Sequence, residues 1–156
     1  MPKLFKTACV TYSDVQLFQL VSDVEKYPDF LPFCSKTIIH KSTETLLIAD
    51  MHIGYKGFSG AFQSEVTKRF PVSLDMKQTH GSLKYLTSSW VFKKVSTMQP
   101  RGVTMQPECI IEFRVDFEPS SWLVGKLVSP LMNEIADMMM QAFIKRADFL
   151  YGNNKI

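Results

Sequence analysis

Apolar side chains recur at every second position between residues 35 and 117, and this pattern constrains the fold more than any other feature of the sequence. In 45–56, for example, Leu47 and Ala49 alternate with polar residues, and 109–117 behaves in the same way. A period of two predicts β-strands with one buried face. Short connections predict that these strands form an antiparallel sheet. Five or six strands are expected, because turn-forming residues divide the region at Gly57, Gly60, Pro71, Gly81 and Pro100-Arg101-Gly102.

The N-terminal part predicts one more strand and a helix. Residues 4–12 have strand-like composition. Ser13 and Gln16 then form the sequence signature of a capping box, so a helix is expected over 14–26. We expect Tyr27-Pro28 to end it, because the residue before a proline is disfavoured in the α region.

A long amphipathic helix is predicted at the other end of the chain, from Ser121 to Tyr151-Gly152. Ser129-Pro130 falls inside this segment and predicts an interruption or a kink. The sheet needs a cover for its apolar face, and this helix has the length to provide one. The helix also holds four of the nine methionines of the chain, and flexible methionines suit a surface that adapts to an apolar ligand or fills a core.

Length and composition predict one ordinary domain. The chain has 156 residues, 46% of them hydrophobic and 21% charged, and a net charge of +3. Its 3 cysteines have no CxxC or CxxH spacing, which excludes a disulfide framework and suits a reducing compartment. No apolar run approaches the ~18 residues of a membrane span, and the chain begins without a signal-like segment. We therefore expect a cytoplasmic protein.

The basic residues are unevenly distributed. The stretch 68–101 contains seven basic residues and Asp75 as its single acid. Such a band can face an anionic partner such as phospholipid or RNA, or it can simply solvate the outer face of the sheet. The residues proposed for an anionic partner are Lys68, Arg69, Lys93 and Lys94.

The sequence has few signs of catalytic or metal chemistry. His40, His52 and His80 are not spaced as metal ligands, and no nucleophile elbow or phosphate-binding glycine loop is present. Asp50 and His52 share the polar face of their strand, where a solvated pair is expected. We therefore predict no catalytic residue, no metal and no required cofactor.

The segment 21–34, with the sequence VSDVEKYPDFLPFC, resembles the coenzyme Q-binding/RatA branch of the START-like (SRPBCC) superfamily, whose bacterial members include ribosome-association toxins. Residues 53–58 with Phe62, and the ending 142–152, fit the same family. The resemblance implies an α+β helix-grip fold, with a curved antiparallel sheet of about seven strands around the C-terminal helix. It also implies an apolar tunnel that binds a polyprenyl quinone or another lipid, with its mouth between Tyr27 and Phe33.

Strand and helix phase, together with this resemblance, select a set of residues for the apolar tunnel. The set is Tyr27, Phe30, Leu31, Phe33, Trp90, Phe92, Phe113, Leu131, Ile135, Met138, Met139 and Phe143. A shift of one residue in any strand would move its members to the other face.

Three functions remain open from the sequence. The first is a carrier or chaperone of a quinone or lipid that serves respiration, with peripheral contact at the inner face of a bacterial inner membrane. The second is a ribosome-association factor whose basic band meets rRNA phosphates. The third is an aromatase or cyclase, which would need an acid or base among the inward-phased Ser64, Lys68 and Ser88. The oligomeric state is also left open.

Overall fold

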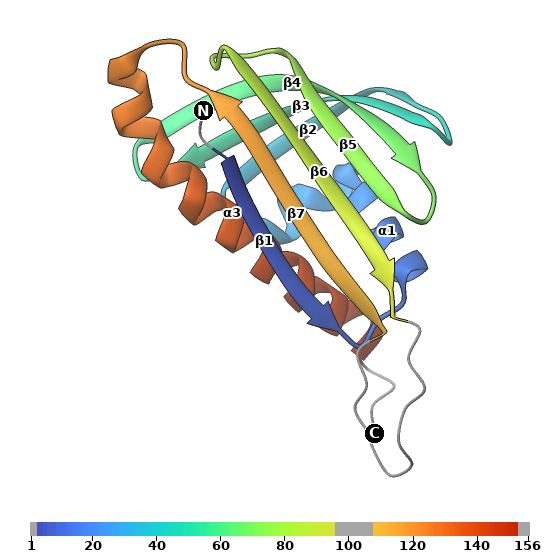
Figure 1. The fold of residues 1–156 in the computed structure, drawn as a ribbon. Coiled ribbons are helices and arrows are strands. Elements are labelled where there is room, and N and C mark those ends of the chain that lie inside the picture. The colour runs from blue at the N-terminus through green and yellow to red at the C-terminus, as the bar shows by residue number, and fades with distance from the viewer. Residues whose placement is uncertain (1–2, 96–107, 153–156) are drawn as a thin grey trace, which may run out of the picture.

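The computed structural model describes residues 3–95 and 108–152, and within these ranges seven strands form one antiparallel sheet in the order β1-β7-β6-β5-β4-β3-β2. Figure 1 shows this sheet with one long helix lying across it. The elements in chain order are β1 (Lys3–Val10), α1 (Asp14–Ser22), η1 (Val24–Lys26), α2 (Tyr27–Phe30), β2 (Cys34–Ser42), β3 (Leu46–Tyr55), β4 (Phe58–Arg69), β5 (Ser73–His80), β6 (Tyr85–Lys94), β7 (Cys109–Glu118) and α3 (Trp122–Tyr151).

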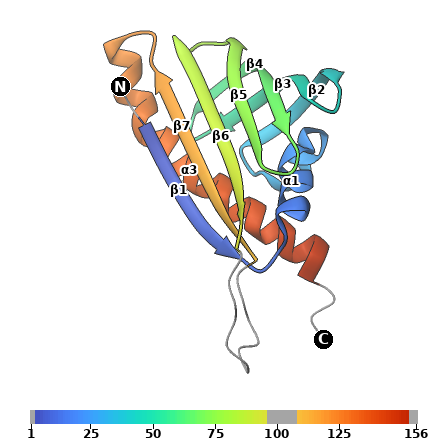
Figure 2. The same ribbon diagram turned by 45° about the vertical axis from the view of Figure 1, so that its right-hand side comes forward.

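The arrangement confirms the helix-grip fold. Every pair of neighbouring strands is antiparallel, and β1 closes the order by pairing with β7, the last strand of the chain. Figures 1 and 2 show α3 running along one face of the sheet, while α1 lies at the end of the molecule near the C-terminal part of α3. The long C-terminal helix is therefore the cover that the one-sided strands require.

The β3–β4 hairpin sets the inward face of the sheet. Its two-residue turn places Lys56 at φ 48° and Gly57 at φ 80°, the left-handed pair of a tight hairpin whose twist matches the flanking strands. The register then runs without a shift from Tyr55 opposite Phe58 to Leu46 opposite Thr67. Alternate residues of both strands therefore face α3 along the whole hairpin.

The segment expected as one helix over 14–26 is divided in the structure. The Ser13–Gln16 capping box forms as predicted, with both hydrogen bonds present at 3.0 and 3.1 Å. The α-helix ends at Ser22, however, because the hydroxyl of Tyr27 donates to the Val21 carbonyl at the point where another turn would continue. Pro28 does not prevent a helix: it lies in the first turn of α2, where its missing N–H costs nothing.

The expected interruption at Pro130 does not occur. α3 continues through this residue as a single helix of 30 residues. Proline has no N–H to donate to the carbonyl four residues earlier in the helix. Because Pro130 is exposed, its ring and that carbonyl lie on the solvent side of the helix. The helix ends at Tyr151, next to Gly152, as predicted.

Candidate ligand-binding cavity

An apolar cavity of about 150 Å³ lies between the sheet and α3. The inner faces of β3, β4, β5, β6 and β7 form one wall, and α3 with the α1–α2 region forms the other. The α3 side chains in the wall are Val128, Met132, Ile135, Ala136 and Met139, which recur every three or four residues. This spacing places them on one helical face, the face that the long amphipathic pattern presents to the sheet.

The accessible side of the cavity lies where β4 begins and β5 ends. Gly60, Ala61 and Ser82 line the cavity and are themselves exposed. We call this edge the rim. Tyr27 and Phe33 also line the cavity, but both are buried. These two residues therefore belong to the buried part of the wall, and a mouth in the turn between them stays a prediction.

Aromatic packing closes the wall near Tyr27. The rings of Trp90 and Phe113 stack at a centroid distance of 4.0 Å, and Phe143 meets Trp90 edge-on at 5.1 Å and Tyr27 at 5.3 Å. Phe143 is fully buried. Burial also raises the pKa of the Tyr27 hydroxyl, which remains a protonated donor to Val21.

Three polar side chains of the lining donate hydrogen bonds to backbone carbonyls. Ser64 Oγ donates to Ala49 O at 3.4 Å, and Gln78 Nε2 donates to Leu83 O at 2.9 Å. Lys68 lines the cavity, but its ammonium reaches the β2–β3 turn and donates to Thr43 O at 2.9 Å. Among the described lining residues there is no carboxylate, histidine or cysteine.

The structure places half of the predicted tunnel residues on the cavity wall. Those in the wall are Tyr27, Phe33, Trp90, Phe113, Ile135 and Met139. Those outside it are Phe30, Leu31, Phe92, Leu131, Met138 and Phe143. Contact between the first group and a ligand stays a prediction. The second group does not line the cavity in this structure.

The residues outside the wall serve packing instead. Phe92 has the inward phase that was expected, but its ring meets Phe18 of α1 at 6.2 Å, beyond the end of the cavity. Phe30 packs against Phe143 at 5.5 Å, behind the wall. Leu31 is buried among the core residues, whereas Leu131 and Met138 lie on the flanks of α3 and are partly buried.

Most of the strand side of the cavity is formed by residues outside the predicted tunnel set. The missed lining residues include Leu47, Ala49, Met51, Phe62, Val66, Leu74, Met76 and Leu86. The alternation that predicted the strands already placed these side chains on one face. It could have identified them, since no aromatic ring or methionine is needed to form an apolar wall.

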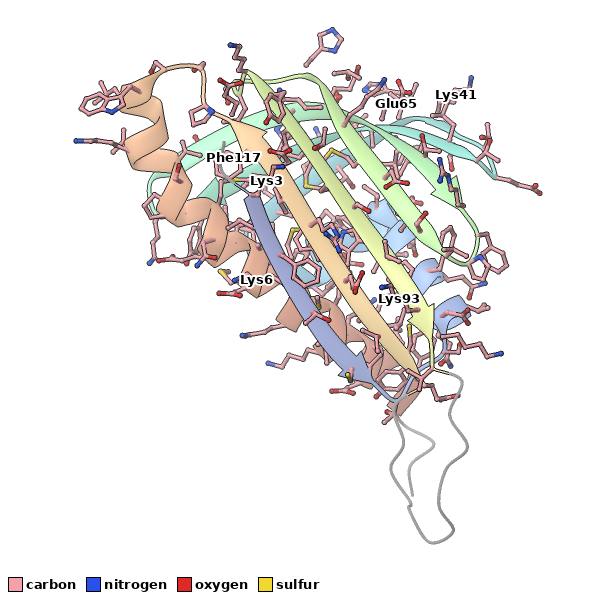
Figure 3. All side chains as sticks on the ribbon, viewed as in Figure 1. Lys3, Lys6, Lys41, Glu65, Lys93 and Phe117 are labelled. Carbon is pink, nitrogen blue, oxygen red and sulfur yellow. The ribbon has the colours of Figure 1, made fainter. Side chains whose placement is uncertain are left out.

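The four residues proposed for an anionic partner do not lie on one face. Lys68 belongs to the cavity side of β4, whereas Lys93 lies on the outer face of β6, where its ammonium is 3.1 Å from Glu112 Oε2 (Figure 3). Arg69 and Lys94 are exposed. Two further basic residues of the stretch are paired across the sheet, Lys77 with Glu65 and Lys84 with Glu118, while Arg101 lies outside the described residues.

The histidines lie away from the cavity. His40 Nε2 is 2.9 Å from Asp50 Oδ2, and this contact lowers the pKa of the Asp50 carboxyl. Asp50 thus pairs with His40, and not with His52 as the sequence suggested. Within residues 3–95 and 108–152 no three metal-ligating side chains gather, and no helix has the length and apolar character needed to cross a bilayer.

Comparison with solved structures agrees with the fold. A START superfamily protein from Mycobacterium smegmatis superimposes with a TM-score of 0.77 at 18% identity, covering 95% of this chain and 98% of that one. The Zhui aromatase/cyclase from Streptomyces sp. R1128 gives a TM-score of 0.77 at 12% identity, covering 97% and 98%. These likenesses concern the backbone arrangement.

Sequence comparison gives relatives with two kinds of name. The ribosome association toxin RatA of Escherichia coli (strain K12) is 34% identical over 152 residues, which are 97% of this chain and 90% of that protein. The mitochondrial coenzyme Q-binding protein COQ10 of Drosophila melanogaster is 30% identical over 142 residues, 90% of this chain and 56% of that protein. Residues 10–144 match the family described as polyketide cyclase / dehydrase and lipid transport. The chain therefore belongs to the polyketide cyclase / dehydrase and lipid transport family.

Proposed function

We propose that this protein binds a polyprenyl quinone, or a lipid of similar shape, in the cavity under α3 and shields it from water without covalent chemistry. The observation that carries this proposal is an apolar cavity that is open at the rim and contains few polar groups. Each CH₂ group that leaves water contributes ~0.8 kcal/mol, so a long isoprenoid chain needs little polar recognition.

The volume of the cavity suggests how such a ligand is held. A space of about 150 Å³ matches the size of an apolar cavity that takes up benzene in another protein. One ring or a short length of tail therefore fits the cavity as it stands. The remaining tail would leave through the rim, or the flexible Met132 and Met139 would move to admit more of it.

The biological role that we propose is that of a carrier or chaperone that serves respiratory electron transport at the inner face of a membrane. The name of the COQ10 relative supports a quinone as the ligand. The lack of carboxylate, histidine and cysteine among the described lining residues supports binding in preference to catalysis. No further cofactor is needed for this function.

The experiment is organic extraction of the protein purified from its native host, followed by mass spectrometry for polyprenyl quinones. We expect a quinone or lipid in stoichiometric amount. A titration with a short-chain quinone, in the absence of membranes, then measures the affinity directly. An empty extract together with no binding in the titration would reject the proposal.

A second function is supported by the relatives that bear the name ribosome association toxin, at up to 34% identity over almost the whole chain. In this reading the exposed Arg69 and Lys94 meet rRNA phosphates. Cosedimentation with large ribosomal subunits tests it. Binding that weakens steeply with salt, and that is lost when Arg69 and Lys94 are both changed to Glu, would favour this function over lipid carriage.

A further inference from the structure

The first turns of α3 expose an unusual amount of apolar surface. Trp122 is 75% exposed, Leu123 64% and Leu127 68%. Leu127 is followed by Val128, which is buried in the cavity wall. This part of the helix is thus apolar toward the cavity and toward solvent, whereas a helix that is apolar on all sides is normally covered.

The charges at this end favour an anionic partner. Between Pro119 and Asn133 the chain contains no acidic residue, and its single charge is that of Lys126. The Lys126 ammonium lies 4.2 Å above the Trp122 ring. The nearest carboxylates in the sequence, Glu118 and Glu134, are each paired with a lysine, so among the described residues they do not neutralise Lys126.

The exposed surface continues directly to the cavity. Val128 and Met132 of the same helix line the cavity, together with the exposed rim residues. Figures 1 and 2 both place the start of α3 at the end of the molecule where β6 begins and β7 ends. A ligand that passes the rim therefore emerges on the side of the cavity that Val128 and Met132 of α3 line.

We propose that Trp122, Leu123, Lys126 and Leu127 form a docking surface for an anionic lipid bilayer, against which the rim opens. A tryptophan ring and a lysine beside exposed leucines match the layers of a membrane interface, where rings lie at the headgroups and ammonium groups meet phosphates. A bilayer also explains why the uncovered surface adjoins the cavity. This inference rests on the proposed function, since it gives the route by which a lipid enters.

The test is cosedimentation of the full chain with vesicles of phosphatidylcholine and phosphatidylglycerol. The variant Leu123→Ser/Leu127→Ser should lose about tenfold or more in vesicle affinity. The matched control is Phe149→Ser/Leu150→Ser, which removes similarly exposed side chains, 64% and 43%, from the other end of the same helix. This control should bind vesicles like the wild type.

Two further measurements make the result specific. Lys126→Glu should weaken binding to the anionic vesicles but not to pure phosphatidylcholine. The tryptophan emission should shift to the blue on vesicle binding, and Trp122→Phe should abolish that shift, because Trp90 is already buried.

Equal vesicle binding by the wild type and Leu123→Ser/Leu127→Ser, or no binding by either, would overturn the docking proposal. A wild-type dimer that this variant converts to a monomer would also overturn it, in favour of a second copy as the partner. The short-chain quinone titration without vesicles reports on the cavity alone. Its failure would reject the proposed function, whatever the vesicles show.

Discussion

Tyr55 Oη donates a hydrogen bond of 2.7 Å to Glu134 Oε2 and so joins the β3–β4 hairpin to the middle of α3. Lys56 Nζ lies 2.9 Å from the same oxygen. We call these three residues the latch. Ile53, two residues before Tyr55, lines the cavity and pairs with the rim residue Gly60. The latch therefore holds α3 against the part of the cavity wall that adjoins the rim.

Replacing Glu134 with Ala should loosen this hairpin. The change removes both contacts of the latch, so we expect faster amide hydrogen exchange in residues 54–59 and faster dissociation of a bound quinone. The control is Asp137→Ala, one turn further along α3, which removes an ion pair with Lys6 of β1 and leaves the latch intact. Equal exchange of the hairpin amides in both variants would contradict a role for the latch.

The latch should also respond to acid. The hydrogen bond from Tyr55, and then the Lys56 ammonium, lower the pKa of Glu134 below its ordinary value of 4.5. A lowered pKa stabilises the folded state above the ordinary value, and this contribution is lost as the pH falls through the folded-state pKa. The wild type and Glu134→Ala should therefore differ in hairpin exchange at neutral pH and converge well below pH 4.5. A difference that persists in acid would exclude Glu134 as the cause.

A charge placed in the cavity should prevent ligand binding. Met139→Glu introduces a carboxylate into an apolar wall, where it must either remain unpaired or take up a proton. We expect quinone affinity to fall by at least about tenfold. Met138→Glu is the control, because Met138 is the adjacent residue but lies outside the wall. Equal loss in both variants, at equal thermal stability, would argue that the ligand binds elsewhere.

These neighbouring methionines also show what the sequence could predict. Strands offer two faces, so the alternation in β3 correctly separates Leu47 and Ala49 from Asp50. Successive residues of a helix point about 100° apart, so Met138 and Met139 face differently although both belong to one broad apolar stripe. A hydrophobic pattern alone does not decide which of them reaches the cavity.

The sequence also could not predict where along each strand the cavity ends. Phe92 shares the face of Trp90, but the cavity ends between them because α1 brings Phe18 against Phe92. The contact between these two rings depends on how α1 docks, which local sequence does not encode. Local sequence does not encode the position of the rim either, because that position follows from how β4 pairs with β5.

Phe143 should be the most sensitive core position of α3. It is fully buried and meets the rings of Tyr27, Phe30 and Trp90. Phe143→Ala should reduce the free energy of unfolding by about 3–5 kcal/mol, as is typical when a buried ring is removed. Phe149→Ala, which truncates an exposed ring of the same helix, should change it by less than about 0.5 kcal/mol. Denaturant unfolding of both variants measures the difference, and similar values would contradict the packing described.

Filling the cavity should move stability and affinity in opposite directions. Ala49 is buried and lines the cavity, so Ala49→Leu would extend apolar atoms into space that the sheet and α3 leave open. We expect the free energy of unfolding to rise by about 0.5–2 kcal/mol and quinone affinity to fall, because side chain and ligand compete for one volume. Ala61→Leu at the exposed rim is the control and should change stability little. Filling an empty cavity stabilises the folded state, whereas overpacking a core that is already filled destabilises it. A loss of stability in Ala49→Leu would therefore mean that no open space exists beside Ala49 for a ligand.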